Sequence, residues 1–193
     1  GALHSAVLVR SRGRETISKG AGADPEKATL DYFVRNHFRG LFFGAAAAYT
    51  KGVFSRFPPL QTPFEDIALT FRALLIGRVV YVDAVLVHYD FNDSSISRPL
   101  RIRDQERVRK WFSTIQKNME GLQADYLHYI RSRQATPDAF VLNEIHRIEQ
   151  RCSRAKGLGS RDPVRLLIGM LSYPYDVPLR NRIGFYLGFF GLR

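Results

Sequence analysis

The apolar residues in the first half of the chain change between strand spacing and helix spacing. An uninterrupted apolar run at residues 6–9 predicts a strand, and the Gly-, Ser- and charge-rich residues 11–23 predict a loop after it. Apolar positions three and four apart predict a helix over residues 25–39, with Phe33 and Val34 on its inward face. This order of elements is typical of an α/β region.

A second helix and a further strand are predicted downstream. Thr62 as N-cap, Pro63 at the first helical position and Glu65 closing a capping box together predict a helix start. Gly77 is the predicted end of that helix. The Val-, Tyr- and Leu-rich residues 79–91 then predict either one bent strand or two short strands.

The second half of the chain has the pattern of amphipathic helices. Apolar residues three and four apart predict a long helix over residues 102–133, with Gly121 as a place where it could kink. Another helix begins near Thr136 and directs Phe140, Val141, Ile145 and Ile148 inward. We therefore predict an α/β fold with a partial mixed sheet and helices in residues 1–98, followed by a mainly helical, basic extension in residues 99–193.

Composition and charge add a partner class to this picture. The 29 Lys and Arg against 18 Asp and Glu give a formal net charge of +11, so an anionic partner is expected. Nucleic acid, an anionic membrane surface and the phosphates of a nucleotide sugar all satisfy this expectation. The single cysteine, Cys152, has no partner for an internal disulfide and is expected to be a bystander. No segment approaches the ~20 apolar residues of a membrane-spanning helix.

The strongest candidate for chemistry is the acidic pair at the predicted start of the second helix. Carboxylates are stabilised there by the helix dipole, and the capping box alone explains Glu65. Asp66 lies one residue further, beside the apolar stripe, where local chemistry alone favours a structural role over a catalytic one. The small residues 44–48 allow close approach to the backbone, and tight packing and a binding surface are equally compatible with them.

Taken together, residues 43–97 resemble the second half of family-2 glycosyltransferases, which have the inverting GT-A fold. The shared features are a small-residue stretch, an aromatic and basic pair, a Phe-Pro element, a helix that begins with Glu-Asp, and a Tyr-containing strand before a Ser-rich turn. In this chain they occur in order at residues 44–48, 49–51, 57–58, 65–69, 72–77, 81–82, 86–89 and 95–97.

This resemblance implies a reaction and a set of roles. Asp66 would be the general base that deprotonates an acceptor hydroxyl for in-line attack on a nucleotide sugar, with inversion at the anomeric carbon. Glu65 would be the second catalytic residue, orienting the helix start. The residues expected to line the groove for a glycan or lipid-linked acceptor are Gly44, Ala45, Ala46, Tyr49 and Lys51. The intact enzyme would use a divalent metal, Mg or Mn, held mostly by residues outside this chain.

In the family, the donor nucleotide binds to an N-terminal half that ends in an Asp-x-Asp motif. Asp24 and Asp31 are isolated and do not form such a motif. We therefore expect the donor half to lie before Gly1, and the isolated chain to be a fragment without donor binding or turnover. No metal is assigned to the chain itself: His88 lies in a predicted strand of alternating apolar residues, which favours a packed histidine over a ligand, and His128 and His146 lack a second ligand at metal spacing.

A non-enzymatic alternative stays open. The basic residues between Arg101 and Lys117, together with the aromatic and cationic tail of residues 179–193, would suit a binding module for anionic membrane surfaces. Nucleic acid ranks third as a partner, because no recognisable binding motif accompanies the charge. The expected location is the cytoplasm, with a peripheral position at the inner membrane face as the alternative. The function expected from the resemblance is polysaccharide biosynthesis.

Overall fold

A computed structural model describes residues 1–11, 14–19, 27–38, 44–90 and 105–155 of the chain. Within these residues the fold is mixed α/β, with a four-stranded sheet, five α-helices and one short 3-10 helix. The predicted fold class is confirmed at this level. The predicted Ser-rich turn at residues 95–97 and the cationic tail of residues 179–193 lie outside the described residues.

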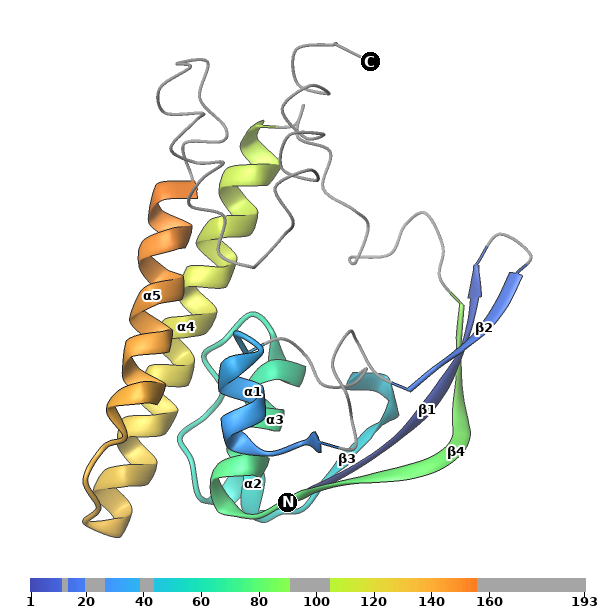
Figure 1. Cartoon of the computed structure of the whole chain (residues 1–193), viewed down its shortest axis with the longest axis horizontal. Helices are drawn as coiled ribbons and strands as arrows, with labels where there is room; N and C mark the ends of the chain where they lie inside the picture. Colours follow the sequence, from blue (N-terminus) through green and yellow to red (C-terminus); the bar gives the residue numbers. More distant parts are fainter. Residues whose placement is uncertain (12–13, 20–26, 39–43, 91–104, 156–193) are drawn as a thin grey trace.

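The sheet is built around β1 (Ala2–Ser11). Two strands pair antiparallel with it, β2 (Arg14–Ser18) over residues 7–11 and β3 (Ala47–Tyr49) over residues 2–4. β4 (Val79–Asp90) runs parallel to β1 along nearly its whole length, so the sheet is mixed. Figure 1 shows these strands projecting to one side of the helices.

The sequence prediction failed at β2, which lies in the segment expected to be a loop. Its side chains are mostly exposed, so no apolar alternation marks it as a strand. Pairing with β1 supplies its backbone hydrogen bonds, from Val7 opposite Ser18 to Ser11 opposite Arg14. β4 was predicted as one bent strand or two, and it is one strand whose register against β1 shifts on both sides of Ala6.

α1 (Leu30–Arg35) is shorter than the helix predicted over residues 25–39. Thr29 is its N-cap and accepts a hydrogen bond from the Tyr32 backbone N–H at 3.1 Å. After the helix, His37 and Phe38 take left-handed backbone conformations with φ of 58° and 53°, which a continuing helix excludes.

α3 (Glu65–Ile76) also begins later than predicted, and the expected capping box does not form. The residue at its N-cap position is Phe64, without a side-chain capping hydrogen bond. Thr62 Oγ1 instead accepts from the Phe64 backbone N–H at 3.2 Å and donates to Asn118 Oδ1 at 2.7 Å. Thr62 therefore ties the segment before α3 to a distant helix. The predicted end of α3 is confirmed, because Gly77 follows its last residue.

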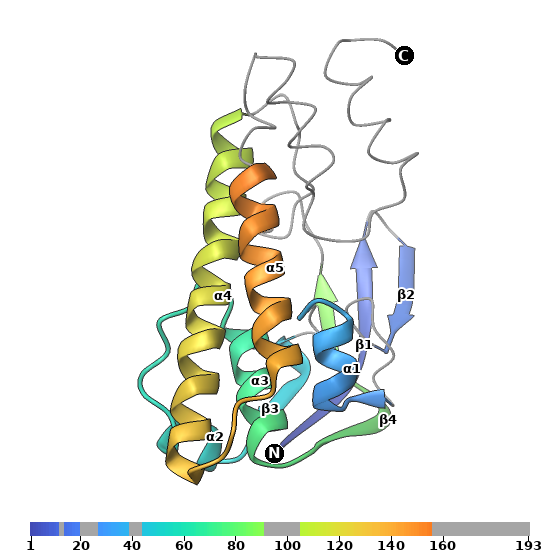
Figure 2. The same ribbon diagram turned by 60° about the vertical axis from the view of Figure 1, so that its left-hand side comes forward.

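The second half of the described chain is a helical hairpin. α4 (Gln105–Arg133) and α5 (Ala139–Ala155) lie side by side in both Figure 1 and Figure 2. Asp138 caps α5, since its Oδ1 accepts from the Phe140 backbone N–H at 2.8 Å. Val141, Ile145 and Ile148 are buried as predicted, whereas Phe140 is 38% exposed and was wrongly placed inside.

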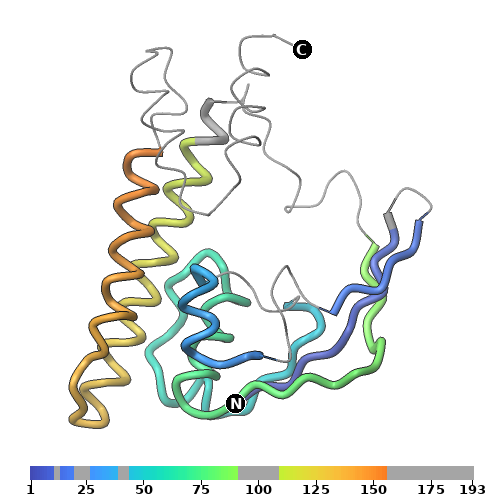
Figure 3. Tube along the Cα trace, in the orientation of Figure 1, coloured from blue at the N-terminus to red at the C-terminus, as the bar shows by residue number. Residues whose placement is uncertain are grey.

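One hydrophobic core joins the two halves of the chain. α1, α2 (Gly52–Ser55) and α3 lie between the sheet and the α4–α5 pair, as the trace in Figure 3 shows. The core takes Phe33, Phe71, Leu122 and Ile145 from four different helices. The predicted boundary near residue 98 therefore separates chain segments that share a single core.

A buried ion pair also joins α3 to α4. Arg72 on α3 donates from Nε and one terminal nitrogen to both carboxylate oxygens of Asp125 on α4, at 2.6 and 2.7 Å. The Arg72 guanidinium also donates to the carbonyl of Pro58 and lies over the ring of Phe57. The segment before α3 packs closely on α4 at Gly121, because a Cβ on Gly121 would come within 2.8 Å of Thr62 Cγ2.

Candidate active site

The acidic start of α3 faces the small-residue segment that precedes β3. The 3-10 helix η2 (Gly44–Ala46) leads directly into β3, and β3 is held by its pairing with β1. A Cβ added to Gly44 would lie 2.9 Å from the Cβ of Asp66 and 3.8 Å from its Oδ2. The absence of a side chain at Gly44 therefore lets the backbone pack directly against Asp66, as the sequence predicted for this segment.

Asp66 is half-buried and has a perturbed carboxyl group. Its Oδ1 accepts a hydrogen bond from the Ile67 backbone N–H at 2.8 Å. Burial raises the pKa of Asp66 above its usual range, the negative charge of Glu65 adds to this effect, and the Ile67 N–H opposes it. A carboxyl with a raised pKa at the surface of a fold is a candidate acid or base, because its proton affinity has moved towards neutral pH.

Tyr49 stands beside the same carboxyl. Burial is the main cause that raises the pKa of Tyr49 to about 12; the nearby Thr70 hydroxyl lowers this pKa, and the charges of Asp66 and Glu65 contribute smaller increases. The Tyr49 hydroxyl is buried, and within the described residues no group meets hydrogen-bond geometry with it. Its neighbour Thr70 has already committed its own proton to the Asp66 carbonyl at 2.6 Å. The Thr70 oxygen keeps lone pairs that could accept from Tyr49, but the two groups do not meet hydrogen-bond geometry, so the neutral Tyr49 phenol has no formed hydrogen bond within the described residues.

The other predicted site residues are dispersed. Glu65 is exposed at the first position of α3, and Ala45 is exposed on η2. Ala46 is buried, so its methyl group packs inward. Lys51 is exposed at the N-cap of α2, with no contact to Asp66 among the hydrogen bonds and ion pairs of the described chain. The structure thus brings Gly44, Tyr49 and Asp66 together, and the roles given to the remaining residues stay predictions.

Sequence reasoning missed Thr70, although a signal for it was present. Thr70 lies four residues after Asp66 on the same helix, and residues at this spacing share a helix face. The contact between Tyr49 and the acidic pair left no such local signal, since it depends on how β3 pairs with β1.

Within the described residues, no group of three or more His, Cys, Asp or Glu side chains could hold a metal ion. His128 Nε2 is hydrogen-bonded to the Arg56 carbonyl at 3.1 Å, and His146 lies 3.2 Å from Glu149 on the same helix. The search of the same residues for a helix both long enough and apolar enough to cross a membrane also finds none.

Comparison with known proteins adds no relative to this picture. No protein-family model matches the chain, and neither a curated protein nor a solved structure is significantly similar to it. Inference about its chemistry therefore rests on the residues and their geometry.

Proposed function

We propose that residues 1–98 form the acceptor-facing part of an inverting glycosyltransferase of the GT-A type, with Asp66 as general base. Asp66 would take the proton from an acceptor hydroxyl as that oxygen attacks the anomeric carbon of a nucleotide sugar. The nucleoside diphosphate would leave from a donor site supplied by residues outside those described. A divalent metal, Mg or Mn, would stabilise its charge there.

The observation that carries the proposal is the contact between Gly44 and Asp66. The resemblance assigns roles to a small-residue segment and to an Asp that are separate in the sequence. In the fold they meet, because a Cβ added to Gly44 would lie 2.9 Å from the Cβ of Asp66. The raised pKa of the same carboxyl gives it a proton affinity suited to a base. Its partial exposure leaves a side on which a ligand could approach.

Tyr49 fits the proposal as an acceptor-positioning residue. Its buried hydroxyl can donate a hydrogen bond to an oxygen that lies next to Asp66, and burial keeps the phenol neutral at physiological pH. Ala45, Ala46 and Lys51 complete the proposed groove, and Glu65 sets the start of the helix. Of the residues behind the membrane-binding alternative, Arg101, Arg103 and the tail of residues 179–193 lie outside the described residues, whereas residues 105–117 belong to α4.

The test uses a natural polypeptide that contains the whole chain, incubated with a panel of nucleotide sugars and Mg or Mn. Release of the nucleoside diphosphate is followed over time. Asp66→Asn should lower turnover by ~10²-fold or more, the usual scale for a lost general base, while donor affinity stays unchanged.

Glu120→Gln provides the matched control, because it removes an exposed carboxylate on α4 that has no role in the proposed reaction. Its turnover should fall by less than about tenfold, since it has no proton to accept in the reaction. Equal turnover in wild type and Asp66→Asn would remove the base assignment. A wild-type protein that neither binds nor cleaves any nucleotide sugar would remove the transferase proposal itself.

A further inference from the structure

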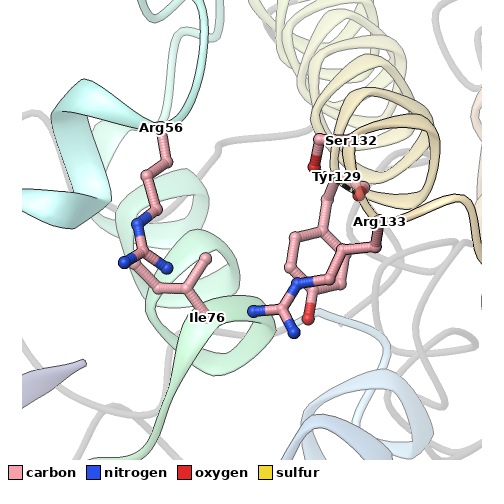
Figure 4. Close-up of a pocket in the computed structure, with 5 residues that line it drawn as sticks. All are labelled: Arg56, Ile76, Tyr129, Ser132 and Arg133. Carbon is pink, nitrogen blue, oxygen red and sulfur yellow. Dashed lines mark hydrogen bonds between the residues drawn. The ribbon is translucent and has the colours of Figure 1, made fainter.

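A small basic pocket lies at the opposite end of α3 from Asp66. It has a volume of about 280 Å³ and is lined by Arg56, Ile76, Tyr129, Ser132 and Arg133. Figure 4 shows the two guanidinium groups pointing into the space between the end of α3 and the end of α4. Ten residues separate Asp66 from Ile76 along α3, so the two places are roughly 15 Å apart along the helix axis.

The side chains of this pocket are positioned by contacts behind them. The Arg56 carbonyl accepts a hydrogen bond from His128 Nε2, which ties the end of α2 to α4. The next residue, Phe57, stacks on Tyr129 with ring centroids 6.4 Å apart and planes 16° apart. Arg133 lies over the same Tyr129 ring, with its guanidinium carbon 5.3 Å from the ring centroid.

Arg56 and Arg133 are two of several described arginines without a carboxylate partner, and they are the two that line the same pocket. Arg10, Arg35, Arg72 and Arg147 each form an ion pair with a carboxylate. Within the same described residues, neither Arg56 nor Arg133 has such a partner, and no carboxylate lines the pocket. Two like charges directed into one small space repel each other, so a bound anion would relieve this repulsion.

The helix dipole gives a structural explanation for the direction of Arg133 but only a weak one for Arg56. Arg133 stands in the last turn of α4, where a cation favourably meets the negative end of the helix dipole. Arg56 is the C-cap residue of α2, but a helix of four residues has only a small dipole, so this effect gives little reason for the direction of Arg56. The convergence of both groups on one pocket needs a further reason.

We propose that this pocket binds a phosphate group, either a free phosphate or diphosphate or the phosphate monoester of a lipid headgroup. Guanidinium forks match the spacing of phosphate oxygens, and two of them supply up to ten N–H donors. The Tyr129 hydroxyl supplies one more donor, while the Ser132 hydroxyl has committed its proton to the Tyr129 carbonyl at 2.7 Å. Ile76 closes one side with apolar surface. The inference does not depend on the catalytic role of Asp66.

The experiment titrates the full 193-residue chain with inorganic diphosphate by calorimetry at fixed ionic strength, comparing wild type with Arg56→Gln and Arg133→Gln. Both arginines are exposed, so the variants should fold normally, which far-UV circular dichroism checks. Each substitution should weaken binding by roughly tenfold or more, because each removes charge-assisted hydrogen bonds.

The control is Arg109→Gln, which removes the same charge from an exposed position on α4. Arg109 is 24 residues before Arg133, or roughly 36 Å along the helix. If Arg109→Gln weakens binding as much as the pocket variants do, attraction by overall charge explains the result and the pocket is refuted. Absence of saturable binding in the wild type, or unchanged binding in both pocket variants, also refutes it.

A vesicle arm separates the two sources of phosphate. Phosphatidylcholine vesicles with and without phosphatidic acid are sedimented with the wild type and with both pocket variants. Retention that requires phosphatidic acid, is lost in the variants and is competed by diphosphate supports a lipid headgroup. Binding of diphosphate in calorimetry without such retention supports a soluble phosphate ligand.

Discussion

Two aspartates on the helices of this protein show opposite treatments of a buried charge. Asp125 on α4 is only 3% exposed, and both of its oxygens accept hydrogen bonds from Arg72. Asp66 on α3 is less buried, yet the charge that shifts its pKa is that of another carboxylate, Glu65. The more deeply buried carboxylate is therefore the better compensated one.

This difference separates a structural charge from a candidate functional charge. Asp125 and Arg72 neutralise each other's charge and hold α3 against α4, so both charges are compensated within the fold without a ligand. The Ile67 N–H offsets the raised pKa of Asp66 only in part, and the hydroxyl of its neighbour Tyr49 forms no hydrogen bond within the described residues. Uncompensated polar groups next to each other are typical of sites where a ligand completes the interactions.

The largest expected effect comes from breaking the compensated pair. Asp125→Ala should lower the free energy of unfolding by about 3–5 kcal/mol, because it leaves the Arg72 guanidinium buried without its counter-charge. Urea denaturation measures the change. Glu120→Ala, an exposed acid on the same helix, should change stability by less than about 0.5 kcal/mol. If both variants are equally stable, the buried pair does not hold the helices together.

The second effect tests the close approach at the candidate site. Gly44→Ala should destabilise the fold by about 1–3 kcal/mol, since the new methyl group would lie 2.9 Å from the Cβ of Asp66 and force a backbone shift. Gly52→Ala is the matched control, because its nearest contact would be the Ile76 methyl at 3.4 Å. Thermal melts of both variants should separate them, and equal melting temperatures would contradict the packing of Gly44 on Asp66.

The third effect has the opposite sign. Asp66→Asn should raise the free energy of unfolding at pH 7 by about 0.5 kcal/mol or more, as expected when a charge kept for function is removed. The folded pKa of Asp66 lies above its unfolded value, so the stability contributed by protonation of Asp66 is fully present below the ordinary carboxyl pKa. This contribution is lost as pH rises through the folded pKa.

The difference between wild type and Asp66→Asn should accordingly vanish at acidic pH and grow towards neutral pH. Denaturation curves collected across this range provide the measurement. A variant that is less stable than wild type at pH 7 would place Asp66 with Asp125 as a structural charge.

The smallest effect concerns the unused hydroxyl of Tyr49. Tyr49→Phe should leave stability unchanged or raise it by up to about 1 kcal/mol, because it removes a buried polar group without a hydrogen-bond partner. In contrast, Tyr126→Phe should lose about 1 kcal/mol, since the Tyr126 hydroxyl accepts from the Asp138 backbone N–H at 2.7 Å. A clear loss of stability in Tyr49→Phe would show that its hydroxyl is already used within the fold.

The pattern of apolar and polar residues correctly predicted those helices and strands that can be recognised from the residues within them. The spacing of apolar positions located α3, α4 and α5 to within a few residues, and the β-branched run after Gly77 located β4. It failed at β2, whose exposed polar residues become a strand only because β1 offers a partner edge. It also failed at the start of α3, where Thr62 bonds to Asn118 across the core instead of capping the helix.

The same division holds for the candidate site. The sequence by itself determined the residue types and their order, including Asp66 at a helix start and a small-residue segment before it. Only the tertiary structure decided that Gly44 packs on Asp66, that Tyr49 stands beside them, and that Arg56 and Arg133 meet in one pocket. The physical reason is that helix and strand signals repeat within a few residues, whereas these contacts join segments through strand pairing and helix packing.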